Sequence, residues 1–326
     1  MRKILPAALL PLLVTAGAAA QLDQTWVQFA PNPARLDMAP TALTSATTEA
    51  SFAVGDLDLD GWADVVAARE EPASPGGKRT DMLLMNDHGV LRDRTAQFAA
   101  LSDVPGDTGF LKPSGDRDAE LGDVDGDGWP DVILARTLHE GEPKSTSHPR
   151  IYRNLGDAAG AWLGLKHEDA RIPQMITVGG LAVAPRFVAV SVGDIDNDGD
   201  LDLHFVDQDG VGVGEGPELP GHDLNDRLLV NDGSGYYTDE SFARMTSTQL
   251  KSLYGIDTRI VDMNGDGAAE ITHLTSDGTP TGLFTEYNEP GNLGHFQALS
   301  QQATIGTKIG ERRVGKECRS RWSPYH

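Results

Sequence analysis

The sequence of 326 residues lacks cysteine almost completely and has no long apolar run that could serve as a membrane span. The single cysteine, Cys318, lies in the terminal segment 311–326, so the rest of the chain can form no disulfide bond. No segment keeps the apolar spacing of an amphipathic helix, which argues against a helical bundle. No apolar stretch approaches the length needed to cross a bilayer, so we expect no membrane insertion of the mature chain.

Positive charge is also scarce, with 27 lysines and arginines against 49 aspartates and glutamates, a net charge of −22. Such an acidic chain is unsuited to binding nucleic acid through its phosphates or to binding an anionic membrane surface. Because 39% of the residues are hydrophobic, a folded chain whose carboxylates are balanced by cations is favoured over a disordered one.

The first twenty residues have the pattern of a secretory signal peptide. Arg2 and Lys3 precede an apolar stretch at residues 4–14, and alanines occupy residues 18–20. We therefore expect residues 1–20 to be removed and the mature protein to be secreted, periplasmic or attached to the cell surface. Residues 21–47 form an N-terminal segment in which residues 26–30 are a candidate outer strand.

The C-terminal segment 311–326 is basic in an otherwise acidic chain and shows neither strand nor helix periodicity. Its residues resemble the translation of a common sequencing adapter, which predicts that they are read-through and foreign to the fold. On this interpretation the natural chain continues past Gly310. The alternative is a genuine basic tail.

Four internal repeats predict the architecture. An acidic pattern closes each of the segments 55–64, 122–131, 193–202 and 261–270, and their first acids lie 67, 71 and 68 residues apart. Each copy is followed by a short apolar run typical of a buried strand, at residues 65–68, 132–135, 203–206 and 271–274. Further along each repeat, an apolar strand and a turn rich in Asn, Asp and Gly indicate a hairpin, as at residues 82–89 and 228–235.

One repeat therefore holds about four strands, which predicts an all-β chain in which each repeat is one four-stranded antiparallel blade of a β-propeller. The expected blades cover about residues 48–100, 118–172, 186–246 and 256–302, within a propeller region of residues 48–310.

The acidic pattern is D-x-[DN]-x-D-G-x-x-[DE], and we number its four copies loop 1 (56–64), loop 2 (123–131), loop 3 (194–202) and loop 4 (262–270). Oxygen atoms at positions 1, 3, 5 and 9 can converge on one point, and hard oxygen donors in such number suit Ca²⁺ better than Mg²⁺. Zinc and copper would call for His or Cys at these positions, where there is none.

An EF-hand loop begins in the same way but needs a glutamate at position 12 and flanking helices. Position 12 is Ala67, Leu134, Phe205 and His273 in the four copies, so the EF-hand interpretation fails. No nucleophile motif or phosphate-binding loop is present, and paired carboxylates for glycoside chemistry have no specificity in so acidic a chain.

The loops and the strands after them resemble the FG-GAP repeats of integrin-α-type β-propellers, and more closely the bacterial VCBS-type repeats. The resemblance covers about residues 51–302 and implies a seven-bladed propeller with Ca²⁺ in the loop between the first two strands of a blade. With four blades visible, it implies an open ring here and about three further blades past Gly310. It implies up to four Ca²⁺ ions, with backbone carbonyls from Trp62, Trp129, Asp200 and Ala268. The implied side-chain ligands are Asp56, Asp58, Asp60 and Asp64; Asp123, Asp125, Asp127 and Asp131; Asp194, Asp196, Asp198 and Asp202; and Asp262, Asn264, Asp266 and Glu270.

Two function classes follow. The favoured one is an exported, non-catalytic binding or adhesion scaffold that binds a protein or glycan through loops on one propeller face. The alternative is the propeller part of a secreted hydrolase or lyase acting on polysaccharides, because related propellers occur in such enzymes.

Overall fold

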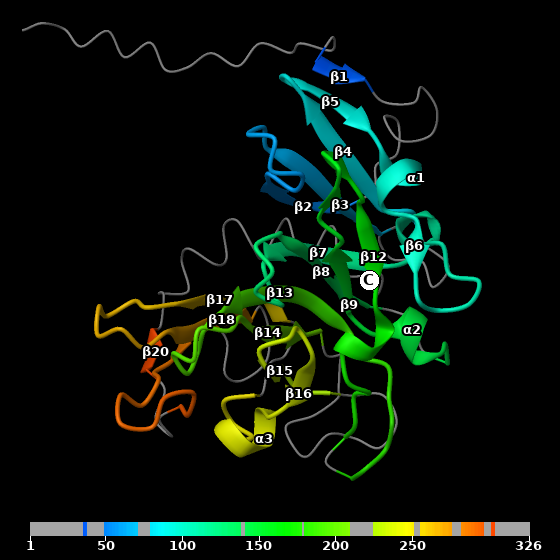
Figure 1. Cartoon of the computed structure of the whole chain (residues 1–326). Coiled ribbons are helices and arrows are strands. Elements are labelled where there is room, and N and C mark those ends of the chain that lie inside the picture. The colour runs from blue at the N-terminus through cyan, green and yellow to red at the C-terminus, as the bar shows by residue number, and fades with distance from the viewer. Residues whose placement is uncertain are drawn as a thin grey trace, which may run out of the picture. The chain divides into compact units, whose positions relative to one another are not determined.

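The computed structural model describes residues 35–37, 49–70, 79–137, 141–177, 179–208, 224–250, 255–275, 282–296 and 301–303. In these residues it contains four antiparallel sheets, numbered sheet 1 to sheet 4 in chain order (Figure 1). The expected signal peptide, the candidate strand at residues 26–30 and the segment 311–326 lie outside the described residues. The prediction of an all-β chain built from antiparallel sheets is confirmed, and the propeller stays a prediction.

Sheets 1 and 2 each have four antiparallel strands and a fifth, parallel strand at the outer edge. Sheet 1 consists of β2 (Glu49–Gly55), β3 (Asp64–Glu70), β4 (Met82–Asp87), β5 (Val90–Asp93) and the parallel strand β1 (Leu36–Asp37). Sheet 2 consists of β7 (Asp116–Gly122), β8 (Asp131–Arg136), β9 (Arg150–Asn154), β12 (Leu165–His167) and the parallel strand β6 (Leu101–Ser102). The fifth strands were not foreseen. Each comes from the segment before its sheet and pairs with an otherwise open edge.

Sheets 3 and 4 have four antiparallel strands each. They consist of β13 (Phe187–Gly193), β14 (Asp202–Asp207), β15 (Arg227–Asn231) and β16 (Tyr237–Asp239), and of β17 (Gly255–Val261), β18 (Glu270–Thr275), β19 (Gly282–Glu286) and β20 (Gln301–Ala303). Among the described residues, the connections hold a small hairpin and five single turns of helix. These are β10 (Asp157–Ala158) with β11 (Ala161–Trp162), α1 (Thr95–Phe98), η2 (Gly109–Leu111), α2 (Lys144–Ser147), η3 (Asp169–Arg171) and α3 (Ser241–Arg244).

The second strands of sheets 2 and 3 are buried on both faces, which explains their continuous apolar runs. In β8 every residue is buried. Val132 and Leu134 pack in a core cluster with residues of sheet 1, whereas Ile133 and Ala135 pack in another with residues of sheet 3. Sheet 2 therefore lies between its two neighbours in the chain, and alternate side chains of one strand serve different cores.

Successive sheets meet along their first strands, because β7 packs against β2 and β13, and β13 packs against β17. Polar side chains link these strands. The Ser51 hydroxyl donates to Asp118 Oδ1 over 2.6 Å, and the Val190 amide donates to Asp118 Oδ2 over 3.1 Å. One half-buried carboxylate thus connects three sheets.

A repeated asparagine near the end of each third strand, which we call the anchor asparagine, links neighbouring sheets. Its side-chain amide donates to the carbonyl at position 2 of the preceding sheet's acidic loop in three cases: Asn154 to Leu57 over 2.8 Å, Asn231 to Val124 over 2.8 Å, and Asn288 to Ile195 over 2.6 Å. The same amide also donates to the position-8 carbonyl of its own loop, as Asn231 does to Leu201. The fourth anchor, Asn86, makes only this second contact among the described residues.

The two outermost sheets each have one neighbour among the described residues, and their apolar side chains reflect this. Phe52 of β2 is 64% exposed, whereas Val190, at the same place in β13, is fully buried. Met263, at position 2 of loop 4, is 56% exposed, whereas Leu57 at position 2 of loop 1 is fully buried. In the described residues, the side chains that neighbouring sheets cover elsewhere are thus exposed at these two sheets.

The anchor asparagines yield a test of how sheets are joined. Asn231→Ala removes a donor to two carbonyls and should lower the free energy of unfolding by about 2 kcal/mol, measured by chemical denaturation. Asn86→Ala is the matched control and should cost less, because no described contact of Asn86 reaches another sheet. Equal losses in the two variants would contradict the inter-sheet role.

A buried ionic cluster lies between sheets 3 and 4. His273 Nδ1 is 3.0 Å from Asp226 Oδ2, and its Nε2 is 3.6 Å from Glu286 Oε1. Burial alone would lower the pKa of His273, but the two carboxylates outweigh burial and raise the pKa to about 9. Neighbouring His204 has no such partner, and burial lowers its pKa to about 4.

This cluster predicts a pH dependence of stability. The pKa of His273 in the folded protein exceeds the unfolded value of about 6.5, so its stabilisation is complete below that pH and is lost as pH rises through about 9. Denaturation over this range should show a falling free energy of unfolding in the parent protein. His273→Gln cannot carry a charge at this position. Its free energy of unfolding should be lower than that of the parent protein at the acidic end of the range and should decrease less as pH rises. Parallel curves for the two proteins would refute this.

Candidate metal centres

The acidic loops share one backbone conformation, set by glycine at position 6. Gly61, Gly128, Gly199 and Gly267 have φ between 87° and 96°, in the left-handed region that other residues rarely adopt. The first acid of each loop accepts the amide of this glycine, as Asp123 Oδ2 does from Gly128 over 2.9 Å. The acid at position 5 accepts the amide of position 7, as Asp127 Oδ1 does from Trp129 over 3.0 Å. The loop therefore wraps around its own carboxylates.

Three of the four loops bring carboxylates together. In each, one oxygen from each of three acids lies within 4.8 Å of the other two. The groups are Asp56, Asp58 and Asp64 in loop 1; Asp123, Asp125 and Asp127 in loop 2; and Asp194, Asp196 and Asp202 in loop 3. Asp60, Asp131 and Asp198 belong to the same loops but lie outside these groups. The four predicted ligands of loop 4 form no such group among the described residues.

The acid at position 9 has a structural role that the sequence did not suggest. Asp131 is fully buried, and its oxygens accept the amide of Val124 over 3.0 Å and the amide of Asn154 over 2.7 Å. Asp64 and Asp202 make the equivalent pairs of hydrogen bonds, to Leu57 and Asn86 and to Ile195 and Asn231. This carboxylate therefore joins the start of the loop to the end of the third strand.

Burial of these carboxylates is unfavourable for their charged form. It raises the pKa of Asp64 to about 6 and the pKa values of Asp131 and Asp202 to about 7, even though each accepts two backbone amides. Nearby loop acids raise them further. A positive charge beside the loop would relieve this repulsion.

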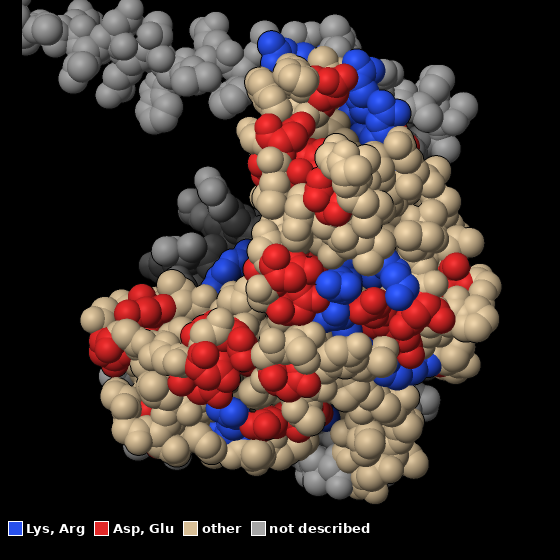
Figure 2. Space-filling view, viewed as in Figure 1, with Lys and Arg blue, Asp and Glu red and all other residues tan. Residues whose placement is uncertain are grey.

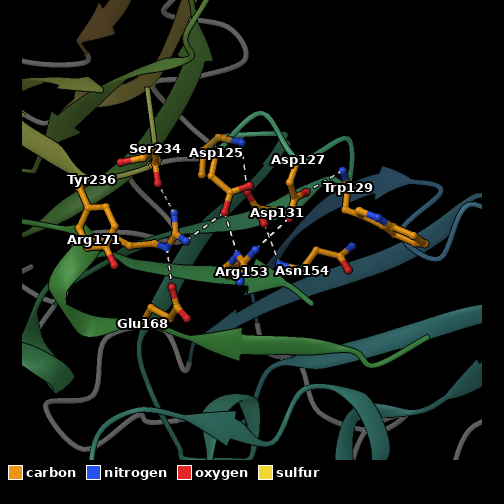
Figure 3. Close-up of polar contacts among 12 residues, drawn as sticks. Asp125, Asp127, Trp129, Asp131, Arg153, Asn154, Glu168, Arg171, Ser234 and Tyr236 are labelled. Atoms are coloured by element: carbon orange, nitrogen blue, oxygen red, sulfur yellow. Dashed lines mark hydrogen bonds and ion pairs between the residues drawn. The ribbon is translucent and has the colours of Figure 1, made fainter. Parts of the chain in front are cut away.

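Arginines already contact loops 2 and 3. Arg153, from the end of β9, donates from Nε to Asp125 Oδ2 over 2.8 Å and from Nη2 to Asp127 Oδ2 over 3.0 Å (Figure 3). Arg171, from η3, also donates to Asp125 Oδ2, over 3.0 Å. In sheet 3, Arg244 lies 3.1 Å from Asp196 Oδ2. Loops 2 and 3 are thus partly neutralised by the protein itself.

Other oxygens in these loops are buried with no hydrogen-bond partner: Asp125 Oδ1, Asp194 Oδ1 and Asp196 Oδ1. A buried carboxylate oxygen without a partner is costly, which makes it a ready ligand for a cation. All donors in these groups are hard oxygens, as Ca²⁺ prefers. The residues of loops 2 and 3 therefore fit a calcium ion.

Loop 4 differs because its polar groups satisfy one another. The side-chain amide of Asn264 donates to Asp266 Oδ2 over 3.0 Å and to Glu270 Oε1 over 3.1 Å. An amide at position 3 thus points donors at the two oxygens that a cation would need. Glu270, one methylene longer than aspartate, still accepts the amide of Met263 over 2.8 Å.

Sequence reasoning did not find the arginines or the anchor asparagines. A signal was present for both: an asparagine lies within two residues of the end of the third strand in every repeat, and Arg171 and Arg244 each follow a glutamate within a single turn after the fourth strand. Figure 2 shows the resulting surface pattern, in which acidic side chains lie in separate clusters with lysine or arginine directly beside the central ones.

Residues 123–205 match the family model of the FG-GAP-like repeat. The matched region runs from the first acid of loop 2 to β14 and so includes loops 2 and 3. The chain thus contains a repeat similar to FG-GAP, as the loop pattern predicted. A comparison with curated protein sequences finds no match. Among the described residues, no helix is both long and apolar enough to cross a membrane.

The roles of positions 5 and 9 can be separated without metal. In EGTA, Asp131→Ala leaves two buried amides without an acceptor and should lower the free energy of unfolding by about 2 kcal/mol or more. Asp127→Ala, in the same loop, removes an exposed acid and should cost less. Denaturant titration measures both, and a larger loss in Asp127→Ala would contradict the structural role of position 9.

Proposed function

We propose that this protein is an exported calcium-binding β-propeller that acts as a non-catalytic binding or adhesion scaffold. The observation that carries the calcium part is the pair of partly neutralised loops 2 and 3, in which buried carboxylate oxygens have no partner. The FG-GAP-like match at residues 123–205 supports a propeller-type scaffold. Neighbouring sheets of this protein pack along their first strands, which is how the blades of a propeller pack around its axis.

Calcium in this proposal is a structural ion. The ligands would come from Asp56, Asp58 and Asp64 in loop 1 and from the groups of three acids in loops 2 and 3. Loop 4 would be the fourth and weakest site, because the amide of Asn264 already binds two of its carboxylate oxygens. Each ion would offset the repulsion between carboxylates that the fold forces together, and so would favour the folded state. The anchor asparagine and the position-9 acid fix the loop to two strands and a neighbouring sheet, so that an ion would stabilise more than its own loop.

The partner would be a protein or a glycan held by loops on one face of the propeller. An acidic surface argues against nucleic acid as partner. Residues 1–20 would direct export and be removed in the process, which would place the scaffold where calcium is abundant.

Calcium removal tests this function. Binding to the folded state alone should stabilise it by about 2.7 kcal/mol per site at a hundredfold excess over Kd, so the melting temperature should fall in EGTA and recover in calcium. Native mass spectrometry should count one ion fewer in Asp125→Ala than in the parent protein. The control Asp157→Ala, an exposed acid of β10 outside the loops, should keep the parental count. An unchanged melting temperature together with no bound ion would refute the proposal.

A further inference from the structure

Arg153 lies across two of the carboxylates of loop 2. Figure 3 shows its guanidinium facing Asp125 and Asp127, while Arg171 approaches Asp125 from the other side. The Arg153 side chain is 35% exposed, and that of Asp125 is 9% exposed. A planar guanidinium with several donors suits such a bridge between two carboxylates. Arg153 is therefore hydrogen-bonded to carboxylate oxygens of Asp125 and Asp127 that a bound cation would also need as ligands.

Only sheet 2 has a cationic residue at this place. Counting back one residue from the anchor asparagines gives Met85, Arg153, Val230 and Tyr287 in sheets 1 to 4. Met85 and Val230 are buried in apolar clusters. Because the anchor asparagine fixes the register of each sheet, these residues are structural equivalents, and the contact of Arg153 with loop 2 is special to that loop.

The second arginine does not distinguish loop 2 from loop 3. Arg171 holds Asp125 Oδ2 and also donates to the Ser234 carbonyl of sheet 3 over 3.1 Å. Arg244 holds Asp196 Oδ2 in the same way and ends a helical turn before sheet 4. In both loops 2 and 3, an arginine from the following linker contacts the acid at position 3. The two loops differ by Arg153, so a comparison between them isolates its effect.

A binding position remains in loop 2 despite these arginines. Both guanidinium contacts to Asp125 use Oδ2, and Oδ1 of the same carboxylate is buried without a partner. Asp123 has its two oxygens on backbone amides and still lies in the converging group. A cation that binds here would have Asp125 Oδ1 as a free ligand. It would also lie close to the positive charge of Arg153, which is hydrogen-bonded to Asp125 and Asp127.

We infer that Arg153 sets the cation affinity of loop 2, by competing with calcium for Asp125 and Asp127, so that loop 2 fills at higher calcium concentration than loops 1 and 3. This rests on the proposed calcium binding. Repulsion between a guanidinium and a divalent ion a few ångströms apart, partly screened by water, corresponds to about a tenfold change in affinity. Loop 2 would then respond to changes in calcium over a range in which loops 1 and 3 stay occupied.

The test uses Tb³⁺ as the probe ion, which takes the same oxygen ligands, in a Trp62→Phe background. Trp129 of loop 2 is then the one acidic-loop tryptophan that can sensitise its luminescence, because loops 3 and 4 have Asp200 and Ala268 at that position. Arg153→Met introduces the residue found in sheet 1. It should raise the affinity of loop 2 for Tb³⁺ and for competing Ca²⁺ by about tenfold. Arg153→Lys keeps the positive charge but cannot make the two-pronged contact. Its affinity for Tb³⁺ should lie between that of the parent protein and that of Arg153→Met.

Arg92→Met is the matched control. Arg92 is 34% exposed and pairs with Asp87 over 3.0 Å, away from loop 2, so its removal should leave the sensitised titration unchanged. Equal or weaker binding in Arg153→Met, while native mass spectrometry still counts ions in the other loops, would overturn the inference alone. Absence of bound ions from every variant would overturn the proposed function with it. Should Arg153→Met fail to fold, Arg153→Lys decides, because a parental affinity there would contradict competition through the two-pronged contact.

Discussion

The buried carboxylate at position 9 is the interaction on which the first three repeats depend. In sheets 1 to 3 it accepts one amide from the start of the acidic loop and one from the end of the third strand, so it fixes the loop to the sheet before any cation is considered. The anchor asparagine that supplies one of these amides then reaches the preceding loop with its side chain. One asparagine and one acid thus hold the loop, its sheet and the neighbouring sheet together, and the other loop acids are arranged around that frame.

The cost of this frame is negative charge brought into a small space. The protein offsets the repulsion between these carboxylates in three ways. Backbone amides are directed at the carboxylates, arginines contact them, and, in our proposal, calcium binds to them. The loops use these means in different proportions. Loop 2 has two arginines and loop 3 has one, whereas loop 4 replaces an acid with Asn264, whose amide group binds its neighbours. Although the four loops share one sequence pattern, they therefore differ in how many carboxylate oxygens remain free to bind an ion.

The strands and the loops could be predicted from the sequence because their signals are local. An acidic pattern with glycine at position 6 dictates the turn, and the apolar run after it dictates a strand buried on both faces, as in β8. The links between repeats could not be predicted, because they join distant residues. Asn231 lies 107 residues from Val124, and Arg171 lies 46 residues from Asp125. Arg171 and Arg244 come from linkers of variable length, in which no fixed spacing marks them, and Arg153 occupies a strand position that is uncharged in the other sheets.

The anchor asparagines give the structure a direction. In every observed link the acceptor belongs to the earlier sheet and the donor to the later one: Leu57 precedes Asn154, Val124 precedes Asn231, and Ile195 precedes Asn288. During synthesis, a sheet that has left the ribosome already displays the carbonyl that the next sheet will need. Each newly made repeat can therefore dock on a sheet that is already folded, which would allow co-translational folding to proceed by addition from the N-terminal side.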